Sequence, residues 1–438
     1  MQKFYISRRN FIKKSATAAA AATVFPYIHS CKTGVTQPMT RSFGRLNFNV
    51  TTLGLGGQAS IQWTPEDVDP VKIILKAFKL GVNYFDTSNL YGPSQNNFGK
   101  AFRQLSLVPG LSGYNETLRN SIWLTSKTHL RTAKGDLGVE GVRNRTNGPD
   151  GSHTVDDVKR TLSQIFGDGN GNYPKGAYLD MVLLHSITNR KDLEVVFEGY
   201  ENPDPRAETI GALAALRDLR DGTNATGLNP QEEKLIRHVG FSGHYSAPVM
   251  MELIRRDTDN LLEGMLVAIN ANDKLNLNMQ HNIIPVAAAK NMGIIAMKVF
   301  ADGAMYTKEA TWSRVPDHVV RTVGSEKLPS RPLVNYSLTT PGIHTAIIGI
   351  GQVDDTNPEN CQLEQNLNAA QIKPDGMSES EREAVEQMAR AAKEGRTNYF
   401  QVAEGGLTPV TDAAVSQMKS DGQRKVKLTW NTAIAGDA

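Results

Sequence analysis

The chain has 438 residues, of which 39% are hydrophobic and 21% charged, and its formal net charge is +3. This balance is typical of a soluble globular protein. Because acidic and basic residues are mixed along the chain, nothing indicates a nucleic-acid-binding groove. The two cysteines, Cys31 and Cys361, make no disulfide framework and have no metal-site spacing. No stretch of the chain body approaches ~18 uninterrupted apolar residues, so no membrane span is expected there.

Residues 1–31 are predicted to be an export signal rather than part of the fold. Arg8 and Arg9 stand in the stretch Ser-Arg-Arg-Asn-Phe-Ile-Lys, which resembles the twin-arginine export motif. An Ala-rich apolar stretch follows at 16–25, and its lack of charge argues against a basic amphipathic helix. The sequence ending at Cys31 resembles a bacterial lipobox. We therefore expect an exported, periplasmic protein, and acylation of Cys31 would anchor it to a membrane surface as a lipoprotein.

From residue 40 onward, short apolar strands alternate with amphipathic helices. Residues 41–50 are predicted to form a small hairpin. The next strand runs into a glycine-rich bend at Gly57, which lacks the spacing of a dinucleotide-binding fingerprint. The predicted strands lie at 50–57, 82–85, 121–126, 179–184, 236–241, 265–269, 293–297 and 345–348, and the predicted helices at 71–80, 98–105, 154–165, 210–219, 248–255, 281–291, 332–338 and 358–370.

Apolar strands that alternate with helices predict a parallel sheet covered by helices. Eight such units in ~330 residues fit a closed (β/α)8 TIM barrel better than an open α/β sheet. The barrel, with its N-terminal hairpin, is expected to span residues 40–375. Residues 376–438 are expected to form a C-terminal extension, with a helix at 379–393 and a polar tail.

Local sequence signals also predict how some of these helices begin and end. Gly81 and Gly293 each follow a predicted helix and are expected to be C-caps. Thr154 and Asp157 are expected to form the two ends of a capping box.

Polar residues stand where the predicted strands stop. In a (β/α)8 barrel the carboxyl ends of the strands form the rim that carries the active site. The residues expected to converge there are Asp86, Lys127, His185, Ser242, Lys298 and Gly349. Tyr91 follows Asp86 by a short polar stretch and precedes a Gly-Pro turn.

Four of these residues are interpreted as one proton relay: Asp86, Tyr91, Lys127 and His185. The ammonium is expected to lower the pKa of the phenol from ~10, and the carboxylate to hold the ammonium in place. The histidine would orient a substrate oxygen. Taken singly, Lys127 and His185 are more often structural residues, so the prediction depends on their combination. Such a set predicts interconversion of a carbonyl and an alcohol, with Tyr91 as general acid/base and the hydride drawn from a cofactor.

Residues 81–92 resemble the signature of the aldo/keto reductase family, and the segments Leu-Thr-Ser-Lys127 and Leu-Leu-His185 resemble its lysine and histidine segments. The resemblance spans about residues 40–370, in family order. It implies a (β/α)8 barrel that reduces carbonyl compounds with NAD(P)H. It also implies that Tyr91 is the acid/base and that the other three relay residues support it.

On the cofactor side, residues 239–242 and 341–349 resemble the family's later segments. The resemblance implies that NADP or NAD is bound by residues from several strand ends, namely Gly57, Ser242, Met297, Lys298, Gly349, Gly351, Gln365 and Asn366.

The chain departs from the family on this side. Gly-His follows Ser242 where an Asn is usual, Met-Lys-Val-Phe stands at 297–300 where an aromatic residue would stack on the nicotinamide, and Gln365 replaces a Glu. No Lys or Arg lies between Gly349 and Asn360 to meet a 2′-phosphate, so the choice between NAD and NADP stays open.

The main hypothesis is therefore an exported oxidoreductase that acts on a small carbonyl, such as a sugar-derived one, and holds its cofactor tightly. The alternative is a non-catalytic nucleotide-binding barrel that serves as a redox- or ligand-sensing surface protein, which would not need the phenol–lysine pair. A metal-dependent hydrolase would need clustered ligands at strand ends, and no metal site is predicted. No nucleic-acid partner is expected, membrane contact is expected only through Cys31, and the sequence does not specify the oligomeric state.

Overall fold

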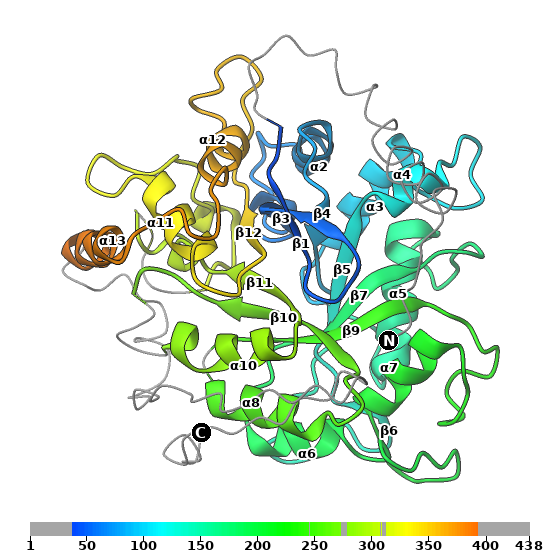
Figure 1. Cartoon of the computed structure of the whole chain (residues 1–438). Coiled ribbons are helices and arrows are strands. Elements are labelled where there is room, and N and C mark those ends of the chain that lie inside the picture. Colours follow the sequence, from blue (N-terminus) through cyan, green and yellow to red (C-terminus); the bar gives the residue numbers. More distant parts are fainter. Residues whose placement is uncertain (1–36, 245, 273–277, 307, 309–311, 393–438) are drawn as a thin grey trace, which may run out of the picture.

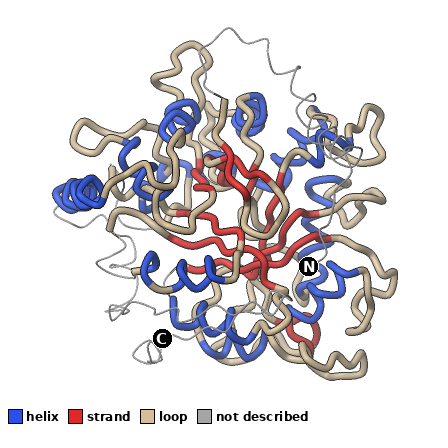
Figure 2. The backbone as a smooth tube through the Cα atoms, in the orientation of Figure 1, coloured by secondary structure: helices blue, strands red, loops and turns tan. Residues whose placement is uncertain are grey.

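A closed barrel of eight parallel strands forms the centre of the computed structural model, and helices surround it (Figures 1 and 2). The strand order around the barrel is β10-β11-β12-β3-β4-β5-β7-β9. This confirms the predicted (β/α)8 barrel. The structure describes residues 37–244, 246–272, 278–306, 308 and 312–392. The predicted signal with Cys31 and the polar tail lie outside these residues.

The barrel strands are apolar because they are covered on both faces; β5 and β7, for example, are buried at every position. Each ends close to the position predicted from the end of its apolar run. The strands are β3 (Leu53–Gly56), β4 (Tyr84–Asp86), β5 (Trp123–Thr128), β7 (Leu179–Leu184), β9 (Ile236–Gly243), β10 (Leu262–Ala268), β11 (Gly293–Met297) and β12 (Thr345–Gly349).

Helices cover the outside of the barrel: α2 (Pro70–Lys79), α3 (Ser94–Gln104), α4 (Glu116–Asn120), α5 (Thr154–Phe166), α6 (Arg190–Val196), α7 (Ala212–Asp221), α8 (Ala247–Arg256), α10 (Ile283–Ala289), α11 (Ser330–Leu338) and α12 (Gln362–Ala369). Short 3-10 turns add η2 (Ala59–Ile61), η3 (Met279–His281), η4 (Ala301–Gly303) and η5 (Pro316–His318). The sequence did not predict α4 and α6.

The predicted helix at 210–219 begins later than expected. Ile210–Gly211 form the short strand β8, which pairs antiparallel with β6 (Thr132–Lys134) beside the barrel. Because this pairing joins segments far apart in sequence, local periodicity gives no signal for it.

Two of the predicted helix caps are wrong. The N-cap of α5 is His153, whose backbone N–H donates to Asp156 at 2.9 Å, and Asp157 therefore bonds elsewhere. Gly81 has the expected positive φ of 86°, but Gly293 does not, and Asn291 (φ 52°) makes that turn. A Cβ on Gly293 would lie 2.5 Å from Leu46 Cδ1, so close packing explains this glycine.

The predicted hairpin closes the amino end of the barrel. β1 (Thr40–Ser42) pairs antiparallel with β2 (Asn49–Thr51), drawn in blue in Figure 1. The ring of Phe43 at its turn is fully buried, with its centre 5.8 Å from that of Tyr84 and 5.3 Å from that of Trp123. These are the first residues of β4 and β5. The opposite, carboxyl end is therefore the open one.

The C-terminal helix α13 (Glu379–Ala391) packs against α11 at the edge of the barrel (Figure 1). Tyr336 donates to Glu386 at 2.7 Å, and Arg382 donates to the Tyr336 carbonyl at 2.9 Å. None of the helices in the described part of the chain is long and apolar enough to cross a membrane.

Candidate active site

A cavity of about 480 Å³ opens at the carboxyl ends of the barrel strands. This volume is within the range of small-molecule sites. Of the residues predicted for the site, those that line the cavity are Gly57, Asp86, Tyr91, His185, Met297, Lys298, Gly349 and Asn366. Residues from strands far apart in sequence therefore converge on one cavity.

Lys127 lies behind the cavity wall and connects Asp86 to Tyr91. Its ammonium bonds to Asp86 Oδ1, donates to the Thr87 carbonyl at 2.9 Å, and lies 4.7 Å from the centre of the Tyr91 ring. The side chains of Lys127 and Asp86 are 1% and 2% exposed. Burial raises the pKa of Asp86 and lowers that of Lys127, and their pairing opposes both shifts. The pair therefore places a buried cation against the face of the phenol.

The Tyr91 phenol has its pKa raised well above the usual value, first by burial and then by the charges of Asp86 and Asp302. The prediction of a lowered pKa is therefore wrong. Burial outweighs the attraction of the Lys127 ammonium, which lies over the ring and is paired with Asp86. A raised pKa keeps the phenol protonated at neutral pH, which is the form that can donate a proton to a carbonyl oxygen.

His185 completes the predicted group of four. Its ring lies edge-to-face with that of Tyr91, with centres 5.8 Å apart, and its Nδ1 is 3.3 Å from Ser88 Oγ. Burial, followed by the nearby charge of Lys127, lowers its pKa well below 6.5. The imidazole is therefore neutral at neutral pH, and the contact with Ser88 leaves Nε2 for a substrate oxygen.

Acid is expected to destabilise the barrel through three buried histidines. Burial is the largest cause that lowers the pKa of His129 to about 2, of His244 to about 3 and of His185 well below 6.5. The unfolded chain would protonate these groups near pH 6.5 while the folded one would not, so stability is complete above pH 6.5 and falls as pH drops toward 3. Urea unfolding between pH 7.5 and about 4.5 measures this loss. In His129→Gln the free energy of unfolding should depend less steeply on pH. A free energy of unfolding that does not change over this range would contradict the expectation.

Asp157, expected from the sequence only at a helix cap, instead joins two loops. It accepts hydrogen bonds from Thr128 at 2.9 Å and Thr146 at 2.6 Å, and it also bonds to Asn89. Asn89 belongs to the loop that carries Tyr91, and Thr146 to the long loop between β6 and α5. Asp157 therefore ties the two loops on the catalytic side to each other.

Glycines form one wall of the cavity on the cofactor side. Gly56 on β3 pairs with Gly349 on β12. A Cβ on Gly57 would lie 2.3 Å from the Asp86 carbonyl oxygen, so only glycine fits at that bend. With no side chains there, a flat ring or a phosphate can approach the backbone.

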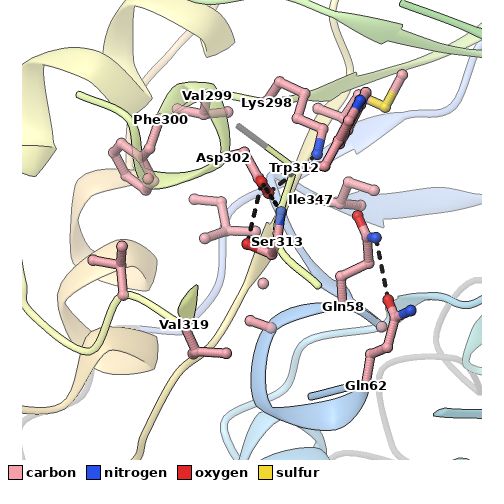
Figure 3. Close-up of a pocket in the computed structure, with 18 of the residues that line it drawn as sticks. Gln58, Gln62, Lys298, Val299, Phe300, Asp302, Trp312, Ser313, Val319 and Ile347 are labelled. Carbon is pink, nitrogen blue, oxygen red and sulfur yellow. Dashed lines mark hydrogen bonds and ion pairs between the residues drawn. The ribbon is translucent and has the colours of Figure 1, made fainter. Parts of the chain in front are cut away.

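Lys298 forms another wall, just beyond β11 (Figure 3). Its ammonium lies 3.2 Å from Asp302 Oδ1 and 4.4 Å from the centre of the Trp312 ring. Asp302 also pairs with Lys308 at 2.6 Å and accepts from the Ser313 backbone N–H at 2.9 Å. Two lysines therefore share one carboxylate beside the cavity. A backbone wall with a cation nearby suits an anionic nucleotide.

Three residues predicted to contact the cofactor lie outside the cavity lining. Ser242 accepts from the Ser186 backbone N–H at 2.9 Å, Gln365 donates to the Pro358 carbonyl at 3.1 Å, and the Gly351 N–H donates to Gln362 at 2.7 Å. In their place the cavity is lined by His244, Gln362, Trp312 and the segment 319–324, apart from Arg321.

The acidic loop after β12 is bound to α2 by lysines. Lys72 pairs with Asp355 at 2.7 Å, and Lys76 pairs with Asp355 at 3.0 Å and with Glu364 at 2.8 Å. Both lysines that reach this loop are therefore already paired with carboxylates. This leaves the choice between NAD and NADP as open as the sequence did.

Hydrogen bonds and an ion pair hold the segment 319–324 in place on the cofactor side of the cavity. Gln362 donates to the carbonyls of Val320 at 3.1 Å and Thr322 at 2.8 Å. Arg321 makes a two-pronged ion pair with Asp67, at 2.6 and 3.0 Å. These contacts join the segment to α12 and to the loop after β3.

The aldo/keto reductase family model matches residues 52–404, so the chain belongs to the aldo/keto reductase family. Membership makes it an NAD(P)-dependent oxidoreductase of carbonyl and alcohol groups. A search of curated proteins found no match. Similar solved structures include an aldo-keto reductase from Pseudomonas aeruginosa (21% identity, 76% of this chain and 93% of that one, TM-score 0.42). Another is an aldo/keto reductase from Klebsiella pneumoniae in complex with NADP and acetate (16% identity, 81% and 95%, TM-score 0.45).

Proposed function

We propose that the chain interconverts a small carbonyl compound and its alcohol, with Tyr91 as the general acid/base. The observation that supports this most is the convergence of Tyr91, His185 and the Lys127–Asp86 pair on one cavity. When bound, the nicotinamide cofactor would supply or accept the hydride. The residues of the chain would orient the substrate and move the proton.

In the direction of reduction, Tyr91 donates its proton to the carbonyl oxygen. The ammonium of Lys127, 4.7 Å from the ring centre, stabilises the negative charge that forms on the phenol. Asp86 fixes that ammonium, and the neutral imidazole of His185 donates a hydrogen bond that orients the same oxygen. In the direction of oxidation the same groups act in reverse.

The residues that would hold the cofactor are those of the glycine wall and the strand ends beside it. Gly57 and Gly349 give access to the backbone, Met297 ends β11 and Lys298 follows it, and Asn366 on α12 also lines the cavity. Trp63, Gln58 and Gln62 add an aromatic and two amides to the cavity, with Gln58 donating to Gln62 at 3.2 Å (Figure 3). Such side chains suit a hydroxylated, sugar-type substrate.

The twin-arginine-like signal supports export of the folded protein with its nucleotide already bound. Because free nicotinamide nucleotide is scarce outside the cytoplasm, the enzyme would have to retain its cofactor and recycle it between two substrates. Mass spectrometry of the nucleotide bound to periplasmic protein, followed by a turnover screen with sugars and aldehydes, tests this proposal. Protein that carries no nucleotide and turns over none of these compounds would refute it.

Replacing Gln362 with Ala is expected to speed release of the bound nucleotide about 10- to 100-fold. The change removes both bonds to the carbonyls of Val320 and Thr322, and each net hydrogen bond contributes about 0.5–1.5 kcal/mol. Nucleotide release can be followed by fluorescence after dilution. Gln371→Ala is the matched control, because among the described residues the Gln371 side chain bonds only to the Leu367 carbonyl, four positions away. Equal release rates in the two variants would show that the segment 319–324 does not retain the cofactor.

A further inference from the structure

We propose that the substrate carries an acidic group, a carboxylate or a phosphate, which Arg143 and Arg145 bind at the mouth of the cavity. The inference rests on the proposed function, because it names the substrate class of the same site. Both arginines line the cavity that Tyr91 and His185 line. They come from the long loop between β6 and α5.

Both arginines are anchored to the catalytic wall through their backbone. The Arg143 carbonyl oxygen lies 2.8 Å from His129 Nδ1, and the Arg145 N–H donates to the His129 carbonyl at 3.4 Å. The ring of His129 in turn lies edge-to-face with that of His185, with centres 5.6 Å apart. The loop therefore holds the two guanidinium groups on the side of the cavity where the proton is transferred.

The Arg143 side chain is also held in place. Its Nη2 donates to the Ser186 carbonyl at 3.1 Å, its backbone N–H donates to Asp192 at 3.0 Å, and its side chain is 28% exposed. A guanidinium that is already held in place loses little further side-chain freedom when a ligand binds.

Among the described residues, positive charge exceeds negative charge on this side. The buried carboxylate of Asp192 is shared, because Arg131 Nη2 lies 3.6 Å from it and Arg143 Nε 3.8 Å. Arg145 is exposed, and no carboxylate of the described residues forms an ion pair with it.

The acidic side chains of the cavity do not offset this excess. The two carboxylates that the described residues contribute to its lining already pair with lysines, Asp86 with Lys127 and Asp302 with Lys298 and Lys308. The pKa of the neighbouring Arg131 is lowered to about 10, first by burial; Asp192 opposes this shift, and the charges of Arg143 and Arg145 contribute to it.

The phosphates of the cofactor do not account for these two arginines. The residues that fit the nucleotide belong to β11, β12 and β3, which are consecutive around the barrel. The arginines follow β5, and β4 separates β5 from β3. The cofactor side has cations of its own in Lys298 and Arg314, both of which line the cavity. The excess charge at Arg143 and Arg145 therefore faces the substrate.

Guanidinium groups suit such a role because their planar fork binds carboxylate and phosphate through paired hydrogen bonds. A neutral carbonyl compound would leave the positive charge at the mouth unmatched. An acidic one would gain affinity there and would also be drawn in from solution. The site is thus expected to favour acidic carbonyl compounds over neutral ones of similar size.

The test compares kcat/KM within two substrate pairs, using protein purified with its bound nucleotide. Succinic semialdehyde is paired with butanal, and glyceraldehyde 3-phosphate with glyceraldehyde. The acidic member of at least one pair is expected to be favoured about tenfold or more, a preference that shrinks as salt rises from about 10 to about 300 mM. A preference within the first pair indicates a carboxylate, and a preference within the second indicates a phosphate.

Replacing Arg145 with Gln is expected to lower kcat/KM for the acidic compound about 10- to 100-fold, mainly by raising KM, as expected for loss of a hydrogen bond to a charged group. Arg145→Lys should keep part of the preference, because the charge remains but the fork is lost. Arg206→Gln is the control, since Arg206 is 89% exposed and lies outside the cavity lining.

Equal kcat/KM within both pairs, or an unchanged preference in Arg145→Gln, would overturn the inference. Loss of bound nucleotide in that variant would also overturn it, because the arginine would then serve the cofactor. If the wild-type enzyme turns over no carbonyl compound at all, the proposed function fails and this inference fails with it. If the enzyme turns over neutral aldehydes and shows no preference for acidic ones, the proposed function stands and only the inference about an acidic substrate fails.

Discussion

Replacing Tyr91 with Phe is expected to lower kcat/KM about 100- to 10,000-fold while the protein keeps its nucleotide. In the proposed mechanism the phenol, which lies beside His185 at the cavity wall, is the proton donor, and Phe has nearly the same shape without the hydroxyl. The stacking of Lys127 on the ring is retained, so the fold should not change. Turnover by the purified holoprotein, together with nucleotide content by mass spectrometry, gives both readouts.

Tyr178→Phe is the matched control for this experiment. Its hydroxyl donates to Asn120 at 2.9 Å just before β7 begins, at the closed end of the barrel. This variant should turn over substrate at the wild-type rate. A Tyr91→Phe enzyme that does the same would refute the mechanism. A wild-type protein that binds nucleotide but shows no turnover would favour the sensing alternative.

Replacing Lys127 with Met is expected to lower the free energy of unfolding by about 3–5 kcal/mol, because it leaves a buried carboxylate without its partner. Asp86 is 1% exposed, and its second oxygen, Oδ2, already has no hydrogen-bond partner. Urea unfolding measures the loss of stability. We also expect kcat to fall at least about tenfold, since the cation against the phenol is gone.

The double variant Asp86→Leu/Lys127→Met separates stability from catalysis. Removing both charges should recover most of the free energy of unfolding, because no unpaired ion stays buried. Activity should stay low, since the phenol still lacks its cation. A double variant that is active would show that the pair is structural only. A single variant as stable as the wild type would contradict the buried ion pair seen here.

The strand ends could be predicted from the sequence because each apolar run stops where the strand leaves the barrel. Asp86, Lys127 and His185 were placed on the rim in this way, and they converge. The pattern of apolar residues indicates only where a strand ends, not how the side chains beyond it are oriented. It cannot tell that the Lys127 ammonium lies against the ring of Tyr91 rather than beside its oxygen, and so it gave the wrong sign for the pKa of the phenol.

The cofactor side was predicted less well because its contacts join distant segments. Gln362 meets Val320, 42 positions away, and Arg321 meets Asp67, 254 positions away. Loops carry no periodicity that would place such pairs. Arg143 and Arg145 were missed for the same reason, since their position depends on His129 and Asp192 rather than on a helix or strand of their own.

The hairpin at the amino end has a consequence for how the enzyme would face its surroundings. If Cys31 carries the lipid expected from its lipobox-like sequence, the nine Cα–Cα steps from Cys31 to Thr40 span at most about 30 Å when fully extended. The hairpin starts at Thr40 and closes the barrel end opposite the cavity. A tether so short would keep the closed end next to the bilayer and point the cavity mouth into the periplasm. Substrate would then approach from the aqueous side, and the lipid would set the enzyme's orientation as well as its location.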